Sequence, residues 1–152
     1  MTLALRGPIL YLPFRFRFQT REEGNVPMPL TINKTIRPNA IWQEMYLRVR
    51  EGQRLVISAE GIWSPEMRPA TITWCGANGI EGLLAGGDYP LPGANVGALI
   101  CRVGPQNPPM AAGVYFDFFS PYEGPLFMAM NENPEYQNQA GSIQAQIILF
   151  ER

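Results

Sequence analysis

The chain has 152 residues, of which 46% are hydrophobic, and it contains fifteen Gly and fifteen Pro. This length suits one domain with a real core, and the absence of an apolar run of about eighteen residues argues against a membrane span. A net charge of −1 provides no strongly basic surface, so we expect no nucleic acid to bind. Frequent turn residues between short apolar runs favour an all-β fold.

Histidine is missing from the chain. Its absence removes the commonest general base and every Ser-His or Cys-His nucleophile system. Two carboxylates can hydrolyse a glycoside, but no pair of acidic residues stands out by its spacing, so we expect no enzyme. The two cysteines, Cys75 and Cys101, are too few for a disulfide scaffold, and buried thiols are favoured over a single bridge.

Apolar and polar residues alternate along most of the chain, as in strands with one buried face. The first such run, residues 10–19, places three phenylalanines on one side and two arginines on the other. No segment keeps a helical period. The alternation predicts nine strands, near residues 10–19, 30–36, 44–50, 53–63, 70–75, 96–103, 113–120, 125–131 and 142–150.

The spacing of these runs is typical of an antiparallel β-sandwich. Residues 75–95 form the longest irregular stretch, and loops of that length are usually functional or poorly ordered. The positions expected to face the core are Met45, Leu47, Val49, Leu55, Ile57, Ala59, Ile143, Ala145, Ile147 and Leu149.

A polar segment near the C-terminus, MNENPEYQNQAGS at residues 130–142, separates two apolar runs. Its carboxylates, Glu132 and Glu135, stand among amides such as those of Asn131 and Asn138. Ca²⁺ takes about six to eight oxygen ligands of these kinds. The alternative is a polar turn whose side chains cap their own backbone.

From about Thr31 onward, the order of features resembles the PA-IL-like (LecA-like) bacterial galactose-binding lectins. The matching stretches are TIRPNAIWQEMYLRVREGQRLVISAEGIW, YPLPGANVGALICRVG and GPLFMAMNEN followed by NQAGS. The resemblance implies a lectin-like sandwich domain over residues 31–152. It also implies a non-catalytic carbohydrate-binding module whose Ca²⁺ bridges protein oxygens and two hydroxyls of a galactose-like glycan. Residues 1–30 have no counterpart and are expected to be an N-terminal extension or assembly strand.

The resemblance also implies a site at the loops around residues 64–68, 76–90 and 131–139. The implied metal ligands are Asn131, Glu132, Glu135 and Asn138. The implied carbohydrate-binding residues are Glu66, Asn78, Asp88, Asn131, Glu132 and Asn138.

The chain departs from the family pattern in ways that favour a second reading. Glu132 stands where an Asp is usual, Gln139 stands where a second Asn is usual, and the histidine that contacts sugar has no counterpart. The alternative is therefore a structural subunit of a larger assembly that keeps the fold without sugar binding. In either reading we expect a homo-oligomer or a subunit of an assembly. An exposed alternating strand at residues 10–19 must be paired, either with a neighbouring subunit or within the chain's own sandwich.

Two further expectations concern the tryptophans and the N-terminus. Trp63 is expected in the core, because Trp dominates sandwich packing, whereas Trp42 and Trp74 are open between core and sugar-stacking roles. The first residues do not show the pattern of a signal peptide, so we expect cytoplasmic synthesis, with non-classical release if the protein acts outside the cell.

Overall fold

The computed structural model describes residues 28–65 and 74–151. The described residues form eight strands and no helix that could cross a membrane. The predictions for residues 10–19 and 70–73 lie outside these ranges, and so does the proposed extension up to residue 27. The strands are β3 (Leu30–Ile36), β4 (Gln43–Val49), β5 (Arg54–Ser64), β6 (Leu99–Val103), β7 (Met110–Ala111), β8 (Tyr115–Phe119), β9 (Gly124–Met130) and β10 (Ala140–Leu149).

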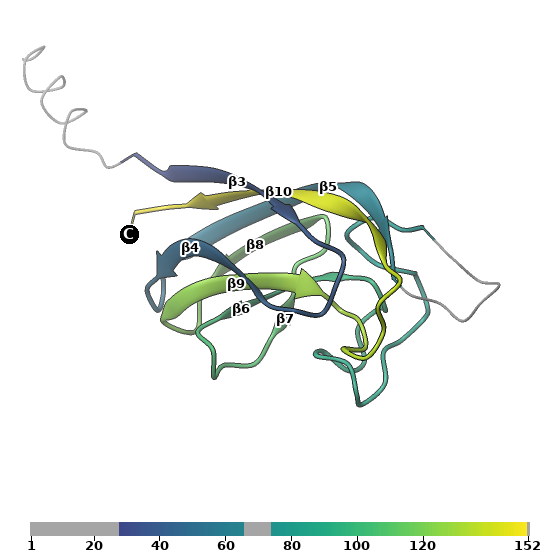
Figure 1. Cartoon of the computed structure of the whole chain (residues 1–152). Helices are drawn as coiled ribbons and strands as arrows, with labels where there is room; N and C mark the ends of the chain where they lie inside the picture. The colour runs from purple at the N-terminus through teal and green to yellow at the C-terminus, as the bar shows by residue number, and fades with distance from the viewer. Residues whose placement is uncertain (1–27, 66–73, 152) are drawn as a thin grey trace, which may run out of the picture.

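The strands form two four-stranded sheets (Figure 1), one in the order β3-β10-β5-β8 and the other in the order β4-β9-β6-β7. Every pairing between neighbouring strands is antiparallel. The predicted antiparallel β-sandwich is therefore confirmed. Strand β10 is central to the first sheet, since it pairs with β3 on one side and with β5 on the other.

The core lies between the sheets and contains nearly all of the predicted inward residues. Ala59 is only partly buried, and Val56, expected on the outer face, is buried as well. Trp63 is fully buried, as predicted, and its indole Nε1 donates to the carbonyl of Gly97 at 2.7 Å. The confirmed inward residues are Met45, Leu47, Val49, Leu55, Ile57, Ile143, Ala145, Ile147 and Leu149.

Both cysteines are free thiols, as favoured from the sequence. Cys101 is fully buried on β6, and burial raises its pKa to about 12. Cys75 is partly buried, and burial raises its pKa to about 11. Cys75 also makes an isolated bridge to Trp63, the only trace of the predicted strand at 70–75 within the described residues. These pKa values make both thiols poor nucleophiles at neutral pH.

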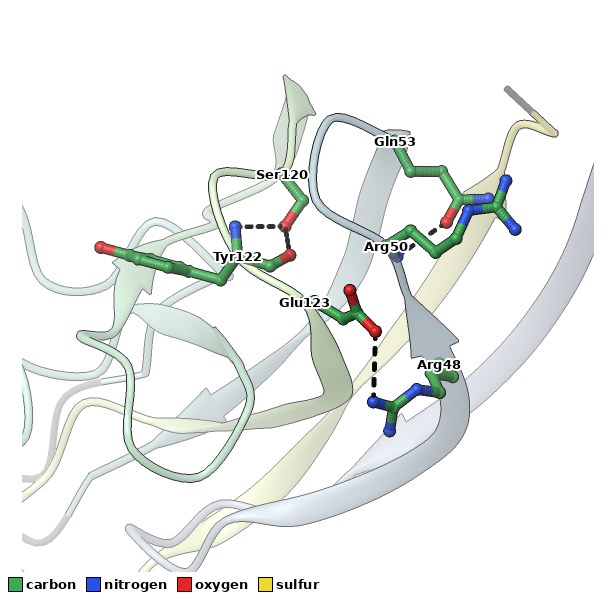
Figure 2. Close-up of polar contacts among 6 residues, drawn as sticks. All are labelled: Arg48, Arg50, Gln53, Ser120, Tyr122 and Glu123. Atoms are coloured by element: carbon green, nitrogen blue, oxygen red, sulfur yellow. Dashed lines mark hydrogen bonds and ion pairs between the residues drawn. The ribbon is translucent and has the colours of Figure 1, made fainter.

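One end of the sandwich is held by two turns that bind each other (Figure 2). The Gly52 N–H donates to the Ser120 carbonyl at 2.7 Å, and the Ser120 N–H donates to the Gln53 carbonyl at 2.8 Å. The Ser120 hydroxyl donates to the Tyr122 carbonyl at 2.6 Å. Arg48 and Glu123 form an ion pair at 3.5 Å, but both side chains are exposed and such pairs contribute little.

Gly141, near the start of β10, is a position that the fold requires to be glycine. Its φ is +85°, and a Cβ there would lie 2.6 Å from the Ile62 carbonyl oxygen and 2.8 Å from both Trp63 Cα and Trp74 Cζ3. Gly82 has almost the same φ, +84°, but a Cβ there would meet nothing within 4 Å. Substituting each of these two glycines therefore separates the cost of backbone strain, which both positions share, from the cost of steric overlap, which arises at Gly141 and not at Gly82.

We predict that Gly141→Ala destabilises the protein far more than Gly82→Ala. The left-handed conformation alone costs about 1 kcal/mol in each variant, and overpacking raises the cost at Gly141 to about 3 kcal/mol. Urea unfolding followed by circular dichroism measures both. Equal losses would show that the contacts around Gly141 relax without cost.

Candidate functional site

The loops of residues 75–98 and 131–139 gather at the end of the sandwich opposite the paired turns (Figure 1). Asn131, directly after β9, joins them. Its Oδ1 accepts from the Leu91 N–H at 3.0 Å, while its Nδ2 donates to the carbonyls of Leu91 at 3.0 Å and Asn95 at 3.2 Å. The side chain is fully buried. This amide therefore anchors the long irregular loop to the end of a core strand.

The next two residues continue this network towards the surface. The Glu132 carboxylate is fully buried and accepts from the Asn133 N–H at 2.9 Å. Asn133 Oδ1 accepts from the Glu135 N–H at 2.9 Å, and its Nδ2 donates to Asp88 Oδ2 at 3.4 Å. The structure thus brings Asp88 to the 131–139 loop, where it contacts Asn133.

Asn78 occupies a different part of the same end. Its Oδ1 accepts from the Val114 N–H at 2.9 Å, and its carbonyl accepts from Asn95 Nδ2 at 3.0 Å. It lines a pocket of about 550 Å³ together with Glu81 and Asn95. Asn78 is therefore linked to Asn131 through Asn95, yet it faces a hollow of its own.

The remaining predicted site residues are placed as follows. Glu135 and Asn138 are exposed on the 131–139 loop. Glu66 lies outside the described residues. The structure therefore brings Asp88, Asn131 and Glu132 together and keeps Asn78 on another side of the loop end.

Trp74 supplies an aromatic surface beside this loop. Its side chain is 49% exposed, and its Cζ3 atom lies directly over the Gly141 backbone, where only a glycine leaves room. The question left open by the sequence is thereby answered: Trp74 is a surface ring and not part of the core. Trp42 is half-buried and lies against Arg102.

Asn133 is a site residue that sequence reasoning missed. The Asn133-Pro134 dipeptide is a signal for a turn in which the Asn side chain binds its own backbone, and the structure shows this bond to the Glu135 N–H. Its second hydrogen bond, to Asp88, could not be predicted from the sequence, because Asp88 lies in a distant loop.

The residues described at 28–65 and 74–151 include no group of three His, Cys, Asp or Glu side chains placed to hold a metal. A Ca²⁺ at the 131–139 loop would therefore depend on Glu132 or Glu135 together with amide and main-chain oxygens. Ca²⁺ accepts such mixed oxygen sets. The amide of Asn131 is already engaged by three main-chain groups.

The chain matches no family model and no curated protein sequence. Among solved structures it is similar to the EclA N-terminal domain, described as a PllA-like lectin, with a TM-score of 0.55 and 17% sequence identity. The similarity covers 83% of this chain and 98% of that domain. The chain therefore has a lectin-like fold.

We predict that Asn131→Asp destabilises the fold, because the carboxylate would face two carbonyls to which the amide now donates. A buried charge without compensation costs about 3 kcal/mol or more. Asn33→Asp is the matched control, since Asn33 is exposed on β3 and the change in charge is the same. Urea unfolding at neutral pH compares them. Equal stabilities would show that the loop is not held by this amide.

Proposed function

We propose that this protein is a non-catalytic, lectin-like carbohydrate-binding module whose sugar site lies at the loop end, beside Trp74. The observation that carries the proposal is the half-exposed indole of Trp74 on Gly141, next to a loop rich in amides and carboxylates. Ligand sites commonly combine an aromatic surface with a few fixed polar groups, and a galactose-like ring presents both an apolar face and hydroxyls.

The polar partners in this proposal are Asp88 and Asn138, which are exposed, while the buried Asn133 holds Asp88 in place. Asp88 and Asn133 are held relative to each other by their hydrogen bond, so part of the site is arranged before a ligand arrives. Preorganisation of this kind lowers the entropic cost of binding. Hydroxyl groups can donate to the Asp88 carboxylate and exchange hydrogen bonds with the Asn138 amide.

Calcium dependence is a separate part of the proposal. The ligands would be Glu132, Glu135 and Asn138 with main-chain carbonyls of the loop, and the ion would supply a positive centre for two sugar hydroxyls. Glu132 is included because its carboxylate supplies oxygen atoms within the same loop, and Ca²⁺ accepts carboxylate oxygens together with main-chain carbonyls.

The alternative function is that of a structural subunit in a larger assembly. This alternative is favoured because the side-chain amide of Asn131, an implied sugar and metal ligand, is hydrogen-bonded to main-chain groups of the long loop. Under this alternative the loop end keeps its network for stability alone, and no glycan binds.

Replacing Trp74 tests the sugar site. We predict that Trp74→Ala weakens binding to galactose-terminated glycans about tenfold or more, because the stacking surface is lost. Phe119→Ala is the control, since Phe119 is an exposed aromatic on β8. A glycan array followed by calorimetry measures both variants, with melting to check folding. The absence of glycan binding in the folded parent protein would support the structural alternative.

Calcium binding is tested by melting. A ligand that binds only the folded state contributes about 2.7 kcal/mol at a hundredfold excess over its Kd, so we predict a rise of several degrees with Ca²⁺ that chelator reverses. Glu135→Gln should reduce this rise, and Glu51→Gln, in the turn at the opposite end, should not. An unchanged midpoint up to millimolar Ca²⁺ would exclude a metal site of useful affinity.

A further inference from the structure

Arg102 on β6 is held between two aromatic rings on the outer face of the β4-β9-β6-β7 sheet. Its guanidinium carbon lies 4.5 Å from the centre of the Trp42 ring and 5.7 Å from that of Phe127. Phe127 is its register partner on β9. Such contacts between a cation and aromatic rings fix the guanidinium in place and stabilise it.

This guanidinium has no acidic partner among residues 28–65 and 74–151. Its Nε is the one buried side-chain nitrogen or oxygen in those ranges that has no hydrogen bond. Within the same ranges the two terminal nitrogens make no hydrogen bond either, and they are not among the buried unpaired atoms. Glu44 lies on the same register line, but Phe127 stands between them.

The contacts with the two aromatic rings therefore hold a charged hydrogen-bond donor in a position from which it can bind an anion. The ring contacts offset part of the cost of leaving the buried Nε without a hydrogen bond, and the two terminal nitrogens remain as donors for a ligand. Burial also lowers the pKa of Arg102, although arginine remains charged at neutral pH. Since ring contacts restrict the side chain before binding, less entropy is lost when its terminal nitrogens engage an anion.

The residue that precedes Trp42 in the chain lines a pocket. Ile41, the residue before Trp42, lines a hollow of about 300 Å³ together with Tyr136 and Gln139 of the 131–139 loop. The hollow combines an aromatic ring with amide groups, which suits a sugar ring. Because Trp42 contacts Arg102 and its neighbour Ile41 lines the hollow, the ligand we consider places one unit in the hollow and the next at Arg102.

We propose that the Arg102–Trp42–Phe127 surface binds the carboxylate of an acidic saccharide, a uronic-acid unit whose neighbouring unit occupies the Ile41–Tyr136 pocket. The guanidinium matches a planar carboxylate in two parallel hydrogen bonds. The inference rests on the proposed carbohydrate-binding function and adds to it a preference for charge. It concerns a surface separate from the Trp74 ring.

The test uses the full chain and a matched pair of probes, trigalacturonate and its methyl ester, which share hydroxyls and differ in charge. Calorimetry should give an affinity for the acid about tenfold or more above that for the ester, and added salt should reduce it. Arg102→Met should abolish this preference, and Arg102→Lys should keep part of it, because the charge stays while the fork is lost.

The controls separate this inference from its alternatives. Arg48→Met removes an exposed arginine from β4 and should leave the preference unchanged, and melting confirms that every variant folds. Equal affinity for acid and ester, or a preference that survives in folded Arg102→Met, would overturn the inference. Binding of neutral galactosides alone would overturn it while leaving the carbohydrate-binding function intact. Binding of an acidic peptide through Arg102, with no binding of trigalacturonate, would assign the surface to a protein partner instead.

Discussion

The hydrogen bonds of Asn131 are the constraint on which the whole loop end depends. The irregular stretch at residues 75–98 makes backbone hydrogen bonds of its own, such as that from the Ala85 N–H to the Ala94 carbonyl, but its remaining buried main-chain groups must be satisfied as well. The buried side-chain amide of Asn131 satisfies three such main-chain groups. It accepts from the Leu91 N–H and donates to the carbonyls of Leu91 and Asn95. Because Asn131 directly follows β9, the loop takes its position from the core.

The two ends of the sandwich differ because their connections differ in length. At one end, the turns at Gly52 and Ser120 are short enough to bond to each other through their backbones. At the other end, the longer loops also bond through their backbones, as the Gly97 N–H does to the Asn131 carbonyl, and the side chains of Asn131 and Asn95 add further bonds to main-chain groups. The loop end is therefore the part of the fold in which polar side chains are concentrated, and it can change its chemistry without disturbing the sheets.

The strands could be predicted because their information is local. Alternation along residues 142–150 places Ile143 and Ile147 inward, and both are fully buried. Strand β7 was missed because two residues cannot show a period. Val56 was assigned to the outer face and is nevertheless buried, since it lies between Ile148 and Asp117 of the neighbouring strands.

The loop site could be predicted only as a collection of residue types. The composition of the 131–139 loop indicates oxygen atoms that suit a metal or a sugar. Which of these oxygens are hydrogen-bonded within the protein depends on partners far along the chain. Asn131 meets Leu91 across forty positions, and Trp74 is presented at the surface by Gly141. No periodicity encodes such contacts, so the sequence shows which residues are polar and not which of them are already engaged.

Some polar side chains are already hydrogen-bonded within the fold, and others are exposed to solvent. This difference decides which side chains can bind a ligand. A group that holds the fold cannot turn towards a ligand without loosening the loop, so Asn131 and Asn78 contribute by fixing positions. Under the proposed function, recognition therefore falls to side chains that the fold leaves exposed at the loop end, such as the Trp74 ring and Asp88, and Arg102 on the sheet is the second group inferred to bind. The Trp74 ring offers an apolar face and Arg102 a fixed charge. The two surfaces are separate, and each matches a different part of saccharide chemistry: the ring matches an apolar sugar face, and the guanidinium matches a carboxylate.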